Sequence, residues 1–206
     1  DRIGIKPLCY LELPGRFLFA SDSKALLQYK GWSRELNPSA VCDYLALRYV
    51  PGEQHLLAPI RHLPPGHSLL YRNGKAELSC YWTPPVQQID EYRSEQSYLE
   101  ELEELLDRSV RRHLISDVGC GAYLSGGLDS SLIVALMSKM SNAPIKTFSV
   151  GFDFEHDELS QASATANQLG CEHQEIICGA QDICSLPDIV RHSGEPLGDA
   201  INIPMY

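Results

Sequence analysis

The sequence predicts an α/β fold in two parts: an α+β part over residues 1–85 and a parallel, doubly wound sheet over residues 97–206. In the second part, short apolar runs alternate with helical stripes, which is the pattern of a parallel sheet with crossover helices. In the first part, β-like runs are joined by strong turn signals, Pro14-Gly15 and Asn73-Gly74. Residues 86–96 follow two prolines and have no periodicity, so we place an interdomain linker there.

The expected elements of the first part are short. We predict strands at residues 5–13, 16–20, 68–71 and 77–81, a helix at 23–27, and a helix after Asn37-Pro38 that faces Val41, Tyr44, Leu45 and Leu47 inward. Pro38 suits the first turn of this helix because its missing N–H would have no partner there. None of these segments carries chemistry that the residues alone reveal, and His62 and His67 are interpreted as structural or exposed.

The second part begins with a long amphipathic helix. Ser97-x-x-Glu100 has the form of a capping box. Apolar residues then recur at helical spacing, at Leu99, Leu102, Leu106, Val110 and Leu114. The elements predicted to follow are a strand at 121–125, a helix at 129–141, a strand at 146–150, a helix at 158–169, a strand at 173–178 and a helix at 182–192.

The most informative stretch is the turn Ser125-Gly126-Gly127 between the first of these strands and its helix. Glycines let the backbone turn tightly and approach a ligand, and several N–H groups then point the same way. The helix that begins at about Asp129 adds partial positive charge at its N-terminus. Such a turn is an anion cradle, and phosphate is the anion that it usually holds.

The better-known glycine motifs do not fit this turn. A Walker A loop needs a lysine after the glycines, and none is present. The dinucleotide fingerprint fails because Leu124 stands where a third glycine should follow Gly119 and Gly121. The nucleophile elbow fails because Tyr123 lies two positions before Ser125. What remains is the pattern Ser-Gly-Gly-x-Asp-Ser.

Composition restricts the function classes. The chain carries 17 Lys and Arg against 27 Asp and Glu, a net charge of −10, which argues against a nucleic-acid partner. No apolar run approaches the roughly 20 residues that cross a membrane, so we expect no membrane partner. The cysteines number seven, without a Cys-x-x-Cys pair, which favours reduced thiols and a cytoplasmic location.

Two further clusters have competing interpretations. The first consists of Cys171, His173, Cys178 and Cys184. Its spacing matches no common zinc site, so we favour core packing over metal binding. The second is the acidic run at residues 153–158, which is suited to a cation, although Asp157 is the expected N-cap of the following helix.

The pattern at residues 125–130 resembles the pyrophosphate-binding loop of the ATP-pyrophosphatase superfamily, whose members adenylate a substrate. Stretches before it are similar to the later part of the glutaminase domain of glutamine-hydrolysing asparagine synthetases. These stretches are Asp1-Arg2-x-Gly4-Ile5-Lys6-Pro7-Leu8, Phe19-Ala20-Ser21-Asp22-x-Lys24-Ala25-Leu26, Leu63-Pro64-Pro65-Gly66-His67 and Tyr81-Trp82. The resemblance covers essentially the whole chain. It implies the end of an N-terminal-nucleophile glutaminase domain at 1–85 and the beginning of an ATP-pyrophosphatase domain at 97–206.

The resemblance also implies a site for ATP and Mg²⁺. The positions that match the adenine pocket are Leu124 and Val150, with Gly151 bordering the same nucleotide. The positions that match the phosphate loop are Ser125, Gly126, Gly127, Asp129, Ser130 and Ser131. Asp129 matches a magnesium ligand, in agreement with the preference of Mg²⁺ for carboxylate oxygens beside phosphates. Glu195-Pro196 and Asp199 fall where the amino-acid substrate is expected, and a direct role for either stays open.

The implied reaction adenylates the side chain of aspartate and joins to it the ammonia released from glutamine. The expected partners are therefore small molecules: aspartate or another carboxylate, glutamine and ATP. A homodimer stays open. In the family, the glutaminase cysteine stands at an N-terminus, and a second acidic loop would follow Tyr206. We therefore expect a fragment that is inactive by itself.

Two alternatives remain at this stage. One is a relative that acts on a different carboxylate, such as a sugar acid of a surface polysaccharide or a β-lactam or peptide precursor. The other is a non-catalytic nucleotide-binding module that kept the loop without its chemistry.

Overall fold

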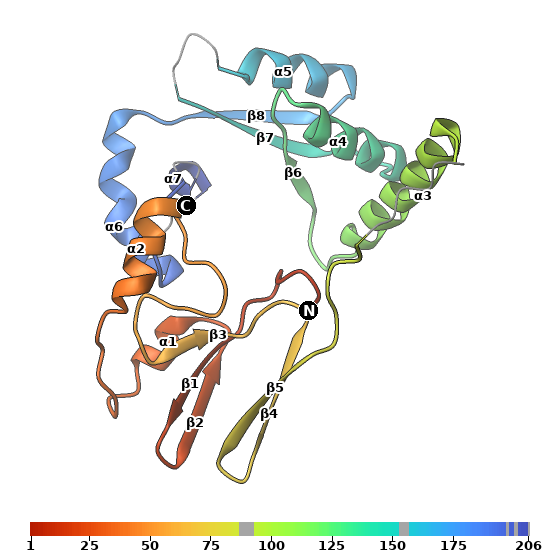
Figure 1. The fold of residues 1–206 in the computed structure, drawn as a ribbon. Helices are drawn as coiled ribbons and strands as arrows, with labels where there is room; N and C mark the ends of the chain where they lie inside the picture. Colours follow the sequence, from red (N-terminus) through yellow and green to blue (C-terminus); the bar gives the residue numbers. More distant parts are fainter. Residues whose placement is uncertain (87–92, 153–156, 197, 200–201, 206) are drawn as a thin grey trace. The chain divides into compact units, whose positions relative to one another are not determined.

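The computed structural model describes residues 1–86, 93–152, 157–196, 198–199 and 202–205 (Figure 1). The chain divides into two compact units, one formed by residues 1–87 and 184–206 and the other by residues 88–183. Residues 184–206, which the sequence suggested as part of the second domain, thus pack with the first unit. Most of the predicted linker at 86–96 lies outside the described residues.

The first unit is built on an antiparallel sheet of three strands in the order β2-β1-β3. β1 (Cys9–Leu13) and β2 (Arg16–Ala20) form the hairpin predicted around Pro14-Gly15, and β3 (Ile60–His62) pairs with the other edge of β1. A second hairpin joins β4 (His67–Arg72) to β5 (Lys75–Cys80). Asn73 and Gly74 both have positive φ there, as the predicted tight turn requires.

Helices and a small apolar core complete the first unit. The helices are α1 (Ser23–Leu27), α2 (Pro38–Leu47), α6 (Leu186–Ser193) and α7 (Asn202–Met205). The core consists of Cys9, Leu11, Leu26 and Ile60. The prediction that Leu45 and Leu47 face inward is wrong, because both are exposed and α2 buries Ala40 instead.

The strand predicted from residue 5 begins only at Cys9. The Asp1 carboxylate explains the difference, since it accepts hydrogen bonds from the N–H groups of Ile3, Gly4, Ile5 and Lys6. These bonds fold the first residues into a loop, and amides that point at one carboxylate cannot also form a strand ladder.

The second unit is a parallel sheet of three strands in the order β6-β7-β8, which confirms the parallel α/β prediction. The strands are β6 (Gly121–Tyr123), β7 (Lys146–Gly151) and β8 (Glu172–Ile177). The connections contain α4 (Leu128–Met140) and α5 (Leu159–Gln168), which can be followed in Figure 1. The end of β6 packs on both helices through a buried cluster of Leu124, Val134, Ala162 and Ala166.

The first helix of this unit, α3 (Glu95–His113), begins three residues earlier than predicted. Its N-cap is Ser94, whose side chain accepts from the Ser97 N–H. The Ser97 hydroxyl is instead held by Arg93, at 3.1 Å from Nε, so it does not cap the helix. The apolar stripe is buried at Val110, whereas Leu99 and Leu102 are about half exposed.

The helix predicted at 182–192 is divided. A 3₁₀ helix, η1 (Ala180–Ser185), precedes α6, and Pro187 lies in the first turn of α6. Because proline has no N–H and clashes with the preceding turn, one continuous α-helix cannot run through this position. Among the described helices, none combines the length and the apolar character that a membrane crossing requires.

Candidate functional site

The Ser-Gly-Gly turn lies at the carboxyl ends of the parallel strands. β6 pairs with β7 as far as Tyr123 opposite Phe148, and the Leu124 N–H still donates to the Phe148 carbonyl at 2.8 Å. The chain leaves the sheet at Ser125 and enters α4 after Gly127, which is the N-cap of the helix. This confirms the predicted strand–turn–helix and places the turn where parallel sheets bind their ligands.

Three consecutive main-chain N–H groups of the turn are held by oxygens of the chain itself. Ser125 N–H donates to Ser130 Oγ at 3.1 Å, and Gly127 N–H donates to Ser125 Oγ at 3.2 Å. Between them, Gly126 N–H donates to Glu158 Oε2 at 3.1 Å. The turn therefore concentrates three donors in one short segment at the start of a helix, which is the arrangement of an anion cradle.

Glycine is required at position 126 because α5 packs directly on the turn. A Cβ atom there would lie 2.9 Å from Gln161 Cβ and 3.3 Å from Glu158 Cβ. Gly151 at the end of β7 is less strictly required, since its Cβ would lie 2.5 Å from Asp157 Oδ2 and Leu159 Cδ1, which are side-chain ends that can move. The two glycines allow the start of α5 to approach both strand ends.

The residues that lead into α5 have roles that differ from the expected ones. The Asp157 carboxylate accepts from Phe152 N–H at 2.8 Å and is not the N-cap. Glu158 occupies the N-cap position, but its side chain makes no capping hydrogen bond and reaches the turn at Gly126 instead. Residues 153–156 of the acidic run lie outside the described residues, so the cation interpretation of that run stays a prediction.

Asp129 and Ser131 lie in the first turn of α4. Ser131 Oγ donates to the Gly127 carbonyl at 2.7 Å, which closes the start of the helix. The Asp129 side chain is exposed, and no described residue forms a hydrogen bond or ion pair with its carboxylate. An uncommitted carboxylate beside an anion cradle is chemically suited to a hard cation such as Mg²⁺.

The two residues expected at adenine lie on neighbouring strands. The Leu124 side chain is buried, its N–H is used by Phe148, and its carbonyl accepts from Ser149 Oγ. A carbonyl oxygen keeps a second lone pair, so this group can still accept from a ligand. Val150 lies two residues after Phe148 on β7, so the main-chain groups of both residues point toward the β6 side of the sheet. Because the pairing of β6 ends at Tyr123 opposite Phe148, Val150 lies beyond the last paired residue of β6.

The expected preference for core packing over zinc holds for two of the three cysteines. Cys171 packs against the apolar clusters of the second unit, and Cys178 is buried, whereas Cys184 is exposed. Burial raises the pKa of the Cys178 thiol, and the Asp182 carboxylate raises it further. A raised pKa disfavours the thiolate that zinc requires.

The first unit contains a cluster that sequence reasoning missed. Glu195 Oε1 lies 2.8 Å from His55 Nε2 and 3.0 Å from His62 Nε2, and Cys9 Sγ lies 3.4 Å from His62 Nδ1. His62 is partly buried against the Glu195 carboxylate, which agrees with a structural role for this histidine rather than with exposure. No sequence signal identifies this cluster, because Glu195 is far along the chain from both histidines.

His55, His62 and Glu195 bring three potential ligand atoms within 4.8 Å of one another, but the hydrogen bonding of His55 favours a proton over a metal at its Nε2. Leu57 N–H donates to His55 Nδ1 at 2.9 Å, so the neutral ring carries its proton on Nε2, the nitrogen that faces Glu195. A protonated nitrogen has no lone pair for a metal. Cys9, reaching only 3% exposure, is also too buried to act as a nucleophile towards a substrate.

The charges of His62 and Glu195 in this cluster stabilise each other. Contact with Cys9 and then with Glu195 raises the pKa of His62 to about 10, although burial opposes the change. Burial by itself would raise the pKa of Glu195, but the rings of His55 and His62 outweigh it and lower that pKa to about 2. Near neutral pH, Glu195 and His62 therefore form a partly buried ion pair within the first unit.

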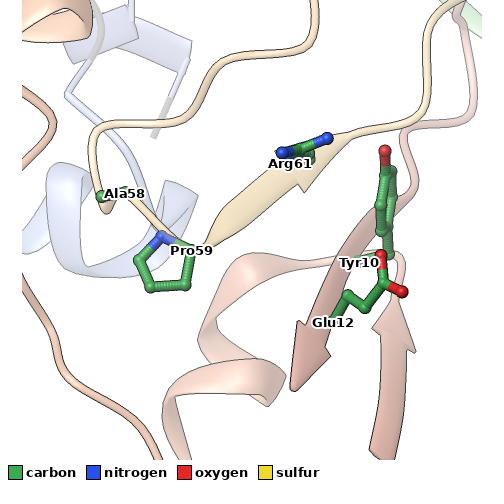
Figure 2. Close-up of a pocket in the computed structure, with 5 residues that line it drawn as sticks. All are labelled: Tyr10, Glu12, Ala58, Pro59 and Arg61. Carbon is green, nitrogen blue, oxygen red and sulfur yellow. The ribbon is translucent and has the colours of Figure 1, made fainter. Parts of the chain in front are cut away.

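A pocket of about 270 Å³ lies beside the sheet of the first unit. Figure 2 shows its lining, with Tyr10 and Glu12 on β1, Arg61 on β3, and Ala58 and Pro59 on the segment that leads into β3. None of the site residues expected from the sequence lines this pocket.

The chain is similar to known proteins along its whole length. Residues 101–206 match the family described as asparagine synthase, and residues 1–82 match the family described as glutamine amidotransferase domain. Asparagine synthetase [glutamine-hydrolyzing] 1 of Bacillus subtilis is 33% identical, over 100% of this chain and 32% of its own length. A putative asparagine synthetase [glutamine-hydrolyzing] of Mycobacterium tuberculosis is 31% identical, over 100% of this chain and 33% of its own length.

A third relative has a different name. Amidase chyE of Penicillium rubens is 29% identical, over 97% of this chain and 32% of its own length. The chain thus spans about a third of the length of the curated relatives that it matches. With half of its residues matched to one family and its glycine turn built as described, the chain belongs to the asparagine synthase family.

Proposed function

We propose that the full-length protein forms an amide from a carboxylate, with glutamine as the nitrogen donor and ATP as the activating substrate. The proposed reaction converts aspartate, glutamine, ATP and water into asparagine, glutamate, AMP and pyrophosphate. The observation that carries this proposal is the turn at Ser125-Gly126-Gly127, with three N–H donors at the carboxyl ends of a parallel sheet. The match of residues 1–82 to a glutamine amidotransferase domain supports glutamine as the donor.

We assign residues 97–206 to the beginning of an ATP-pyrophosphatase domain. The phosphates of ATP are proposed to lie in the turn, where the hydroxyls of Ser125 and Ser130 can rotate to donate to phosphate oxygens. Adenine is proposed to meet the carbonyl of Leu124 and the main chain of Val150. Once their present acceptors give way, these donors would stabilise the charge that grows on the departing pyrophosphate and so lower the barrier.

Asp129 is the residue proposed to hold Mg²⁺, because its carboxylate is exposed beside the turn and no described residue pairs with it. When bound, the metal would neutralise part of the charge on the triphosphate and its leaving group.

The chemistry follows from the need for a better leaving group. A carboxylate cannot lose oxide or hydroxide readily, so its oxygen first attacks the α-phosphorus of ATP, and the bond to pyrophosphate breaks. Ammonia then attacks the acyl carbon of the β-aspartyl-AMP, AMP leaves with its electron pair, and the nitrogen releases one proton to give the amide. We assign no residue of this chain to glutamine hydrolysis.

Isotope transfer tests the proposal. Full-length protein is supplied with ATP, Mg²⁺, aspartate and glutamine that carries ¹⁵N in its side-chain amide. We expect ¹⁵N in the side-chain amide of asparagine, formed in step with glutamate. Labelled ammonia released without any labelled asparagine would contradict the proposal for aspartate.

The alternative is a different acceptor carboxylate. Amidase chyE of Penicillium rubens gives this alternative weak support, since it aligns with nearly the whole chain. Measuring AMP in the same reaction separates aspartate from other acceptors. AMP formation that depends on another added carboxylate, but not on aspartate, would identify that carboxylate as the acceptor.

A further inference from the structure

The group that accepts from the central amide of the turn differs in kind from the groups that accept from the two flanking amides. Gly126 N–H donates to the Glu158 carboxylate, whereas the N–H groups on either side of it donate to serine hydroxyls. A hydroxyl can turn its own O–H toward an arriving phosphate, but an ionised carboxylate only accepts hydrogen bonds. Of these three acceptors, Glu158 is therefore the one that must withdraw when a phosphate takes its place.

The position of Glu158 indicates a role in the turn rather than in its own helix. Helix N-caps favour Ser, Thr, Asp and Asn, whose short side chains accept from the first N–H groups of the helix. Glu158 stands at the N-cap of α5 without such a bond, and its longer side chain crosses to an amide 32 residues earlier in the chain. The close packing of Glu158 against Gly126 keeps the carboxylate within reach.

We propose that Glu158 holds the central phosphate-binding amide of the turn when no nucleotide is bound, and so lowers the affinity of the site for metal-free phosphate compounds. The inference rests on the proposed nucleotide site. Carboxylate and phosphate carry the same sign of charge, so they cannot share the Gly126 N–H, and the displaced carboxylate stays near the anion. A divalent cation beside the phosphates reduces that repulsion. The loss of affinity that Glu158 causes should therefore be greatest when no divalent cation is present.

Calorimetric titration of the full-length protein tests this, with inorganic pyrophosphate and ATP as probes, first in EDTA and then with excess Mg²⁺. Glu158→Gln keeps the side-chain length and removes the charge. We expect it to bind pyrophosphate in EDTA about five to twenty times more tightly than the wild type, because a charge-assisted competitor is replaced by a neutral one. The gain should be smaller with Mg²⁺, and Glu158→Ala should bind in EDTA at least as tightly as Glu158→Gln.

Glu172→Gln is the matched control. It makes the same charge change in the same unit at the opposite end of the sheet, where β8 begins, and it should bind like the wild type. In the NMR spectrum of the unliganded protein, the Gly126 amide proton should move upfield in Glu158→Gln, because its charged acceptor is lost.

The outcomes separate this inference from the proposed function. Unchanged or weaker pyrophosphate binding in EDTA by both Glu158 variants, with Mg-ATP still bound by the wild type, would overturn the role of Glu158 and leave the nucleotide site in place. Failure of the wild type and of every variant to bind ATP in either buffer would overturn the nucleotide site itself.

Discussion

The hydroxyl oxygens of Ser125 and Ser130 lie 2.8 Å apart across the glycine turn. Ser130 Oγ also accepts from Ser125 N–H at 3.1 Å, so one side chain in the first turn of α4 fixes the start of the turn. The distance between the end of β6 and the start of α4 is thereby set before any ligand arrives. Such preorganisation reduces the entropy that a bound phosphate has to fix.

Ser130→Ala should weaken nucleotide binding without unfolding the protein. The change leaves the Ser125 N–H without its acceptor and removes a hydroxyl proposed to face phosphate. We expect Mg-ATP affinity to fall by about five- to tenfold, the effect of one lost hydrogen bond and a looser turn. Ser160→Ala is the control, since the Ser160 hydroxyl contacts only the neighbouring Gln161 among the described residues. Equal affinities of Ser130→Ala and the wild type in calorimetry would contradict this role.

Gly126→Ala should damage the site by sterics. The added Cβ would meet Gln161 Cβ at 2.9 Å, so α5 has to move away from the turn. We expect Mg-ATP affinity to fall by about 5- to 150-fold, from an overpacking cost of about 1–3 kcal/mol. Gly119→Ala is the matched control, because among the described residues none beyond its two chain neighbours has an atom within 4 Å of the Cβ that it adds. If both variants bind Mg-ATP like the wild type, the close approach of α5 is not needed for binding.

Asp129→Asn should change the metal dependence of binding. Amides are weaker ligands for Mg²⁺ than carboxylates, so the benefit of Mg²⁺ to ATP affinity should shrink by about tenfold or more. Thermal stability should change little, because the Asp129 side chain is exposed. The measurement is ATP affinity over a range of Mg²⁺ concentrations, with Asp117→Asn as an exposed control outside the turn. An unchanged Mg²⁺ dependence would remove Asp129 from the metal site.

The ion pair of the first unit should make stability depend on pH. The pKa of Glu195 is lowered from 4.5 to about 2, so its contribution is present above pH 4.5 and is lost as the pH falls toward 2. The pKa of His62 is raised from 6.5 to about 10, so its contribution is present below pH 6.5 and is lost as the pH rises toward 10. The pair therefore stabilises the fold most between pH 4.5 and pH 6.5, the unperturbed pKa values of Glu195 and His62.

Glu195→Gln measures this contribution. We expect it to lower the free energy of unfolding by about 1–2 kcal/mol within that range, less than for a fully buried pair because both side chains are partly exposed. In urea unfolding, the difference in the free energy of unfolding between Glu195→Gln and the wild type should shrink toward pH 9 or above. Glu77→Gln, on an exposed position of β5, is the control. Parallel pH profiles for Glu195→Gln and the wild type would contradict the predicted pairing.

The features that the sequence predicted well depend on neighbouring residues. The turn follows from two glycines between an apolar run and a helical stripe, and its helix begins at Leu128, one residue from the expected start. The hairpin at Asn73-Gly74 follows in the same way from the need for positive φ. Local pattern was misleading where a competing contact or a proline intervened and where an apolar residue of α2 stayed exposed; one example is Arg93, which took the Ser97 hydroxyl so that the cap moved to Ser94.

The features that the sequence did not reveal depend on packing between distant segments. Glu158 reaches Gly126 only because α5 lies against the turn, and a glutamate at a helix start otherwise indicates nothing beyond dipole stabilisation. Glu195 meets His55 and His62 only once the segment after α6 packs on the first unit. Neither contact has a periodicity or spacing that could have predicted it.

The nucleotide products of the full-length enzyme test the central proposal most directly. With glutamine, the acceptor carboxylate, ATP and Mg²⁺ present, phosphorus NMR should detect AMP and pyrophosphate in amounts equal to the amide formed. That result is expected from attack at the α-phosphorus, with the turn at Gly126 and Gly127 proposed to hold the departing pyrophosphate. Formation of ADP and orthophosphate in their place would contradict the proposal.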